Sequence, residues 1–413
     1  MPIVSDIFAL LPPSLALCGE CSISRGAEPA GLVVRSYGCP VLARRRLEEM
    51  SPEDGLHRLE LNLHPNEASG LLAVENGGLL RLRGWDLGFW AVLDEGGIQD
   101  CIALIGHREG AGIGEGWEIE RLRAVPAGSP RKTADAEAIA RRGVFVYAFG
   151  SHFGRKDGPL QPKRGFVARF REDAVEGSAS GFAAELEVYR ESFRLHRLVN
   201  DALRERGPEL VPLREATRRA FVEAAVRRGR EEGKAWSGMV RGGDYPLNFE
   251  GAAFRESGSL LLGLRFPTSA GGRPVLVEME GVERLFEGGL PEVRGFLVVD
   301  AVGRGGEMAG VRDLALVGGA GGEELHLVTG NIDSREGESV LVRDYPEGRD
   351  TVATHFRCAL PAGARSGSLP ARFVREFPDL PRVEGIAVSG DRFFYVTDED
   401  EGVHLRLTRL LAG

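Results

Sequence analysis

The sequence predicts an all-β fold, a β-propeller of about five four-stranded blades with six left open. Glycine is abundant, at 57 of 413 residues, which is typical of many tight turns between short strands. One pattern also recurs along the chain: an acidic residue, small residues, an apolar strand, a Gly-rich turn and a second apolar strand. Because such a unit buries its faces only against its neighbours, the repeats are expected to close into a ring.

The repeat is read from five segments that we align on their acidic residues. They begin at Asn66, Asp135, Asn248, Arg312 and Val383, and read NEASGLLAVENGGLLRLRGWD, DAEAIARRGVFVYAFGSH, NFEGAAFRESGSLLLGLR, RDLALVGGAGGEELHLVTGNID and VEGIAVSGDRFFYVTDED. The aligned acids are Glu67, Glu137, Glu250, Asp313 and Glu384. Most lie about 70 residues apart, with one longer gap after Glu137. This alignment puts the first unit's second strand within residues 79–86, and the fourth unit's third strand at Ser339 onward.

The two ends of the repeat region predict how the ring closes. The last unit ends after its third strand, near Leu411, and a spare strand, HRLELNL, begins at His57. This N-terminal strand can complete the last blade and remove an exposed sheet edge. We therefore expect an N-terminal extension over 1–55, two blades over 56–182, a helical insertion over 183–236, and three blades with the ring closure over 237–413.

The expected insertion fills the long gap between the second and third units. Its apolar positions, such as Leu186, Phe193 and Leu198, recur at helical spacing, and Gly207-Pro208 suits the turn of a helical hairpin. The pattern leaves three roles open: a surface decoration, a lid over the channel, or a surface for self-association or a protein partner.

The acidic residue opens the first strand of each unit, and first strands line a propeller's channel. Five carboxylates around one channel end repel one another unless cations balance them. Ca²⁺ or another divalent cation, held by carboxylate and carbonyl oxygens, is one solution. The metal ligands predicted on this basis are Glu67, Glu137, Glu250, Asp313 and Glu384. Two alternatives stay open: each acid accepts backbone N–H groups between blades, or an acid acts directly in catalysis.

A second polar set follows the second strands. It comprises Arg83 with Asp86, Ser151 with His152, Arg265, Asn331 with Asp333, and Asp398 with Asp400. In a hairpin the end of the second strand returns beside the start of the first, so both sets are expected at one channel mouth. Arginine suits an anionic ligand, and histidine suits acid–base chemistry near neutral pH. We predict His152, Glu250 and Arg265 as catalytic residues. The predicted substrate-binding residues are Arg83, Ser151, Arg155, Lys156, Asn331 and Asp398.

Charge and hydropathy narrow the class of partner. The net charge of −9 argues against general nucleic-acid binding, which needs a basic surface. There is no apolar run long enough to cross a membrane, and no basic residue precedes the apolar N-terminal stretch. The expected partner is an anionic small molecule, and the expected location is the cytoplasm.

Several phrases resemble an uncharacterised bacterial β-propeller family: EGAAF…LLLGLR, EAIA…VYAFGSHFGRK and EGIAV…YVTDEDEGVHLRL. More distantly, the pattern is similar to phytase-like and gluconolactonase- or regucalcin-like propellers. Those propellers hold Ca²⁺ with carboxylates at the channel mouth and hydrolyse phosphoesters or lactones. The resemblance implies a metal-dependent hydrolase whose acids are Glu67, Glu137, Glu250 and Glu384, with Asp313 departing from the glutamate pattern.

Two functions follow as hypotheses. The first is a hydrolase that acts on an anionic small molecule, a phosphoester or a lactone, at the channel mouth. The second is a non-catalytic propeller that binds a ligand or serves as a scaffold for a protein partner.

Overall fold

The fold is described from a computed structural model of the chain. The described residues are 56–63, 67–128, 132–178, 181–190, 193–303, 307–319, 322–333, 339–380, 382–399 and 402–409. The predicted N-terminal extension, residues 1–55, lies outside them. None of the helices in these ranges has the length and apolar character needed to cross a membrane.

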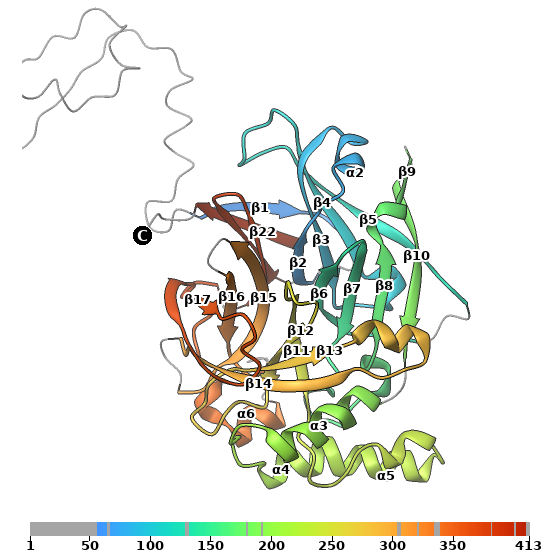
Figure 1. Cartoon of the computed structure of the whole chain (residues 1–413), viewed down its shortest axis with the longest axis vertical. Coiled ribbons are helices and arrows are strands. Elements are labelled where there is room, and N and C mark those ends of the chain that lie inside the picture. Colours follow the sequence, from blue (N-terminus) through green and yellow to red (C-terminus); the bar gives the residue numbers. More distant parts are fainter. Residues whose placement is uncertain are drawn as a thin grey trace, which may run out of the picture. The chain divides into compact units, whose positions relative to one another are not determined.

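Most elements are strands, which form five antiparallel meanders of four strands each (Figure 1). Meander 1 consists of β2 (Ala68–Ala73), β3 (Trp85–Leu93), β4 (Ile102–Arg108) and β5 (Trp117–Pro126). Meander 2 consists of β6 (Ala136–Arg142), β7 (Phe145–Gly150), β8 (Val167–Arg171) and β10 (Gly181–Tyr189), with the short β9 (Glu176–Ser178) beside β10. Meander 3 consists of β11 (Asn248–Phe254), β12 (Leu260–Phe266), β13 (Val275–Glu280) and β14 (Glu292–Asp300).

Meanders 4 and 5 complete the set, and meander 5 includes the first strand of the described chain. Meander 4 consists of β15 (Gly310–Gly319), β16 (Gly322–Gly330), β17 (Thr354–Leu360) and β19 (Arg372–Glu376). Meander 5 consists of β20 (Val383–Ser389), β21 (Arg392–Glu399), β22 (Gly402–Arg409) and β1 (His57–Leu61). β1 pairs antiparallel with β22, from His57 opposite Leu407 to Leu61 opposite Val403. This is the pairing that the sequence predicts for ring closure.

The first strands of the meanders, β2, β6, β11, β15 and β20, surround a common axis. Each packs against the next, and together they line a cavity of about 390 Å³. Its lining is mostly apolar, with residues such as Leu71, Ile139, Leu314 and Ile386. These strands carry nearly continuous apolar runs because both of their faces are covered.

Two outer segments cross from one meander to the next. The first half of β10 pairs parallel with β5, with Phe182 opposite Leu122, and its second half pairs antiparallel with β8. Meanders 3 and 4 repeat this arrangement, because β18 (Gly367–Pro370) pairs parallel with β14 and β19 pairs antiparallel with β17. The pairing joins meander 1 to meander 2, and meander 3 to meander 4.

Two predicted strands are short helices instead. Part of the second strand expected in meander 1 is α2 (Gly77–Arg81), and the third strand expected in meander 4 is α6 (Val340–Asp344). In each case a residue with a short polar side chain caps the helix: the Asn76 side chain accepts from two backbone N–H groups, and the Ser339 side chain accepts from one. The second strand of meander 1 is therefore β3, and the third strand of meander 4 is β17.

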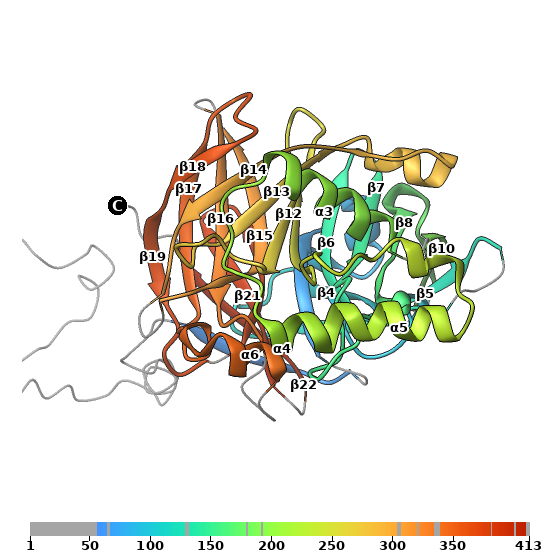
Figure 2. The same ribbon diagram turned by 90° about the horizontal axis from the view of Figure 1, so that it is seen from below.

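The segment between β10 and β11 contains α3 (Arg194–Arg206), α4 (Glu215–Thr217), a π-helical turn (Arg218–Glu223) and α5 (Ala224–Glu231). These helices lie together on one side of the strands (Figures 1 and 2). The expected helical start at residue 183 is wrong, because residues 181–189 form β10. There the buried residues Phe182, Ala184 and Leu186 alternate in the strand period, which the helix-favouring Ala and Glu residues between them obscure.

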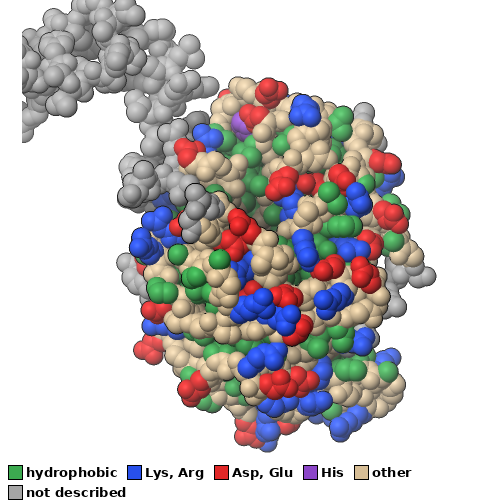
Figure 3. Space-filling model, in the orientation of Figure 1, with side chains coloured by type: hydrophobic (Ala, Val, Ile, Leu, Met, Phe, Trp, Pro, Cys, Tyr) green, Lys and Arg blue, Asp and Glu red, His purple; other side chains and the backbone are tan. Residues whose placement is uncertain are grey.

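Single turns of 3-10 helix occur in the connections. Their bounds are Ile98–Asp100 (η3), Pro162–Arg164 (η4), Glu172–Ala174 (η5), Ala235–Gly238 (η7), Val282–Glu287 (η8) and Pro346–Gly348 (η9). On the face shown in Figure 3, acidic and basic side chains are interspersed.

A buried hydrogen-bonded chain links meanders 4 and 5. The Tyr395 Oη atom lies 3.0 Å from His355 Nδ1, and His355 Nε2 lies 3.0 Å from His326 Nδ1. His326 Nε2 then lies 3.1 Å from the Glu324 carboxylate. Each oxygen and nitrogen atom in this hydrogen-bonded series can act as a donor or an acceptor when both imidazoles are neutral. Burial lowers the pKa of His326 and lowers that of His355 well below the ordinary value.

Candidate functional site: an acidic cluster at one end of the channel

Each of the five inner strands has a β-bulge near its start, at the same place in the repeat. The pairing of the first two strands skips one residue in every meander, and the skipped residues are Ser69, Glu137, Glu250, Arg312 and Glu384. A bulge leaves its extra residue out of the ladder and redirects the side chain. The structure thus gives the repeat a more exact alignment than the sequence does, with three glutamates, one arginine and one serine at the equivalent positions.

The residue after the bulge is small in four meanders because neighbouring inner strands approach closely there. A Cβ atom at Gly385 would lie 3.1 Å from the Cα atom of Gly70, and one at Gly251 would lie 2.8 Å from the Leu314 side chain. These glycines are required by the close approach of the strands. The acidic side chains therefore lie where the ring is narrow.

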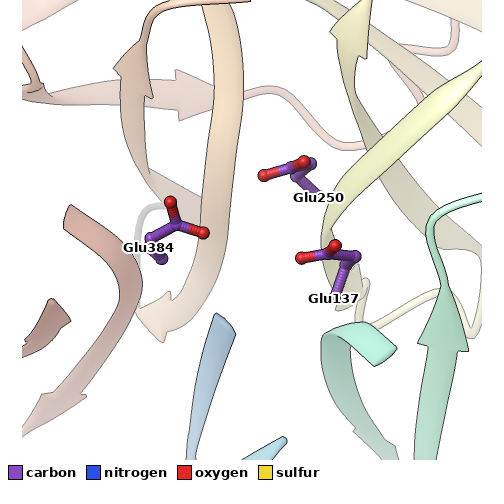
Figure 4. Close-up of side chains that lie close together, drawn as sticks. All are labelled: Glu137, Glu250 and Glu384. Atoms are coloured by element: carbon purple, nitrogen blue, oxygen red, sulfur yellow. The ribbon is translucent and has the colours of Figure 1, made fainter. Parts of the chain in front are cut away.

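Three of the bulge residues converge. Glu137, Glu250 and Glu384 each place a carboxylate oxygen within 4.8 Å of the others. Figure 4 shows the three side chains extending from separate strands toward the same space. All three are buried, and burial, followed by the charges of Glu250, Asp135 and Asp94, raises the pKa of Glu137 well above its ordinary value. We call these three residues the glutamate cluster.

Two arginines balance part of this charge. Arg312, at the bulge position of β15, forms a salt bridge with Glu384 and lies 3.6 Å from the Glu250 carboxylate. Arg265, at the end of β12, lies 2.9 Å from Glu250 and donates to the Asn331 side chain at 3.1 Å. Both guanidinium groups are thus held beside the glutamate cluster. The sequence alignment missed Arg312, because it placed Asp313 at the equivalent position.

Asp313 belongs to the framework and does not join the cluster. It occupies the position that is glycine or alanine in the other meanders, and its carboxylate accepts the backbone N–H of Ile386 on β20 at 2.8 Å. Burial raises the pKa of Asp313 well above its ordinary value. The alternative that an acid connects one blade to the next through backbone hydrogen bonds therefore describes Asp313, and its prediction as a metal ligand is not supported by this placement.

Glu67 is not one of the three converging carboxylates. It precedes β2, two residues before the bulge at Ser69, and its carbonyl accepts the backbone N–H of Asp94 at 3.0 Å. Asp94, directly after β3, is a residue that the sequence analysis missed. Its charge raises the pKa of Glu137, which places its carboxylate near the cluster. The sequence pattern does not point to Asp94, because the apolar segment of α2 resembles the second strand and the true second strand, β3, ends later, at Leu93.

Ser151 and His152 occupy the predicted channel end, with a further acid between them and the cluster. The Ser151 hydroxyl donates to Asp135, whose carboxylate also lies 2.8 Å from Arg164 Nη1. His152 is buried, its Nδ1 atom lies 2.9 Å from the Gly150 carbonyl, and burial lowers its pKa to about 4. His152 is therefore neutral at pH 7, so it has no proton to donate as an imidazolium.

The other predicted substrate-binding residues are dispersed. Arg83 forms a salt bridge with Glu120 at 2.7 Å and stacks over Phe182, on the outer strands, because it follows α2. Its placement at the mouth is therefore wrong. Asp86 likewise pairs with His107 at 2.7 Å.

The remaining predicted residues of the channel mouth lie in loops or outside the described residues. Arg155 and Lys156 are exposed, and Asn331 contacts Arg265. Asp333 acts on the pKa of Arg265 and so lies near it. The Asp398 side chain and Asp400 lie outside the described residues.

The helices between β10 and β11 cover the loops at this end of the ring. Phe221 of the π-helical turn stacks on Phe153 after β7, with ring centroids 4.7 Å apart. The Thr217 hydroxyl donates to Asp344 of α6 at 2.7 Å. The apolar cluster beneath the helices also includes Phe266, the last residue of β12, and Ile332, which follows β16. All of these loops follow second strands, so the helices pack at the end of the ring where the glutamate cluster lies.

Comparisons with known proteins add little to this description. No family model and no curated protein matches the chain. Among solved structures, a levansucrase from Bacillus subtilis is 11% identical over 84% of this chain and 82% of its own, with a TM-score of 0.36. A glucose dehydrogenase is 13% identical over 84% of this chain and 98% of its own, with a TM-score of 0.35. Similarity at this level carries no information on activity.

Proposed function

We propose that the five meanders are the blades of a five-bladed propeller, and that the chain hydrolyses an anionic small molecule, a phosphoester or a lactone, at the glutamate cluster. The observation that supports this is the convergence of three buried carboxylates from three separate strands to within 4.8 Å. Buried carboxylates are stable together only when protons or cations balance them. Such unbalanced carboxylates are typical of catalytic sites, which use their shifted pKa values, and of metal sites, where a cation balances their charge.

The geometry suits a divalent cation with oxygen ligands. Calcium binds carboxylate oxygens at about 2.3–2.6 Å, so two oxygens on opposite sides of one ion lie up to about 5 Å apart. The 4.8 Å limit of Glu137, Glu250 and Glu384 falls within that span. A bound cation would supply Lewis-acid activation of a carbonyl or phosphoryl group and of water.

The chain's own groups have distinct roles in this proposal. Arg265, held by Asn331, fixes the orientation of Glu250. Asp94 and Asp135 add negative charge that a cation would relieve, because their charges raise the pKa of Glu137. His152, neutral at pH 7, is available only as a base. The helices between β10 and β11 serve as a cover that limits water access.

A second function, a non-catalytic binding module, is favoured by one observation. Arg312 already pairs with Glu384 and lies near Glu250, so part of the negative charge is neutralised without any ion. In this case the glutamate cluster stabilises the ring, and the helices present the binding surface.

Metal analysis and turnover assays separate the two functions. The chain is stripped of metal, reconstituted with Ca²⁺, Mg²⁺ or Mn²⁺, and assayed on phosphomonoesters, phosphodiesters and lactones. Glu250→Gln should lower turnover at least about 100-fold with little change in melting temperature. The matched control is Glu75→Gln, an exposed carboxylate at the opposite end of the channel. If the wild type binds no cation and turns over none of these compounds, the hydrolase is rejected.

The binding module is tested by deletion. Removing residues 193–238 and joining the ends with a short Gly-Ser linker leaves β10 and β11 intact. Loss of ligand or partner capture with a folded ring would support the binding module, whereas retained capture would reject a role for the helices.

A further inference from the structure

A second cavity opens between meanders 1 and 2, at the same end of the ring as the glutamate cluster. Its volume is about 500 Å³, and it is lined by Gly96, Gly97, Gln99, Lys132, Thr133, Ala134 and Lys163. These residues come from the connection after β3, the approach to β6 and the η4 turn between β7 and β8. All three segments lie at the end of the ring that carries the cluster. The lining contains two lysines and no acidic side chain.

Several basic side chains lie at this cavity, and Asp135 is an acid that acts on them. Among the described residues, Lys132, Lys163 and the neighbouring Arg155 form no salt bridge, whereas Arg164 pairs with Asp135 at 2.8 Å. Burial, and then the charges of Arg164, Lys132 and Arg155, lower the pKa of Lys163, and the charge of Asp135 offsets only part of this effect. A group of cations held together in this way is relieved by an anion, as a group of carboxylates is relieved by a cation.

The cavity is built from loops that are fixed to one another. The Thr133 hydroxyl accepts the backbone N–H of Ile98 at 2.8 Å, and the backbone N–H of Ala134 donates to the Lys163 carbonyl at 3.1 Å. Gly96 has a φ of +117°, which only glycine adopts without strain. A Cβ atom at Gly97 would lie 2.6 Å from the Gln99 side chain, so the absence of a side chain there leaves room for Gln99 in the lining. The lysines are thus carried by anchored segments, and binding would require little ordering of the backbone.

We infer that this cavity binds a phosphoryl group through Lys132 and Lys163. Lysine binds phosphate as a point charge, and the cavity is large enough for a phosphate with its attached group. Asp135 connects the cavity to the cluster, since its charge acts on both Lys163 and Glu137. On the basis of the proposed hydrolase, the cavity holds one phosphoryl group of a substrate whose reacting bond lies at the glutamate cluster. The substrate class is therefore a small molecule that carries a phosphoryl group besides its reacting bond, which is either a second phosphoester or a lactone.

Phosphate binding is tested without any divalent cation, so that the result is independent of the hydrolase. Inorganic phosphate is titrated into the full-length, metal-free chain by calorimetry at constant ionic strength, with chloride as the comparison anion. The wild type should bind phosphate saturably, and the double variant Lys132→Gln/Lys163→Gln should bind at least about tenfold more weakly. The chain has only four lysines, so Lys234→Gln, an exposed change on the helical segment, is the matched control.

Lysine labelling gives a second measurement that does not depend on affinity. With a lowered pKa, Lys163 should react with acetic anhydride faster than Lys234, and phosphate should protect it.

No saturable phosphate binding, or equal binding by the double variant and the control, would overturn the inference. If phosphate binds but nothing is hydrolysed, the cavity stands and the hydrolase falls. If hydrolysis persists in the double variant with unchanged KM, the cavity has no part in substrate binding.

Discussion

Meander 4 differs from the other four at the axis of the ring. Meanders 2, 3 and 5 have glutamate at the bulge followed by alanine or glycine, and meander 1 has serine followed by glycine. Meander 4 has Arg312 followed by Asp313. One repeat thus supplies a cation at the bulge position, which joins Arg265 in balancing the glutamate cluster, and the carboxylate that binds the backbone of β20. The repeats therefore share one backbone arrangement, whereas the side chains at the bulge give them different roles.

The largest effect is expected from removing the cation of meander 4. Arg312→Met leaves Glu250 and Glu384 buried beside one another without their shared guanidinium, and should lower the free energy of unfolding by about 3–5 kcal/mol. Denaturant unfolding measures this change. Adding Glu384→Gln to the variant should restore part of the stability, because it removes one of the uncompensated charges. A loss below about 1 kcal/mol in the single variant would show that Arg312 is not the main counter-charge.

The next effect tests the second unusual residue. Asp313→Ala leaves the Ile386 N–H without its acceptor and should cost about 1–3 kcal/mol. Asp313→Asn keeps an oxygen acceptor and should cost less than about 1 kcal/mol, because burial favours the uncharged form of Asp313. Thermal and denaturant unfolding at pH 7 compare the two variants. An equal cost for both would show that the negative charge itself is needed.

The histidine chain of meanders 4 and 5 predicts a pH dependence. The pKa of both His326 and His355 is lowered in the folded state, so the unfolded chain takes up protons first as pH falls below about 6.5. Their contribution is full above that pH and is lost as pH falls toward the folded pKa values. Between pH 7 and 5 the wild type should lose about 1–2 kcal/mol more than His326→Gln/His355→Gln does. Parallel unfolding curves across this range would contradict the prediction.

The smallest effect is expected at Glu137, in one of the three meanders that have glutamate at the bulge. Glu137 has a raised pKa, so its charged form destabilises the fold at pH 7, and this cost falls as pH drops toward the ordinary carboxyl value. Glu137→Gln should therefore stabilise the metal-free chain by about 1 kcal/mol at pH 7 and flatten this part of the pH profile. It should also remove any stabilisation by Ca²⁺ that the wild type shows. A destabilised variant would show that Glu137 is balanced by charges already present.

The sequence predicted the repeat and the β1–β22 pairing because both depend on apolar runs that survive divergence. It failed where one residue decides the structure. Asn76 and Ser339 start short helices at apolar runs that resemble short strands, and nothing in hydropathy distinguishes the two. The sequence pattern did not predict the bulge either, because an extra residue in a strand has no fixed sequence pattern. Arg312 was therefore misaligned by one position, and the cluster was predicted with five acids where the structure brings three together.

The outer strands that cross between meanders divide the ring unequally. β10 ties meander 1 to meander 2, and β18 with β19 ties meander 3 to meander 4, while β1 completes meander 5. The helical segment enters the chain between β10 and β11, at a boundary that none of the described outer strands crosses. A chain with this organisation is two doublets and a closing unit, so the boundary after β10 is a natural place to divide it into two fragments that reassemble.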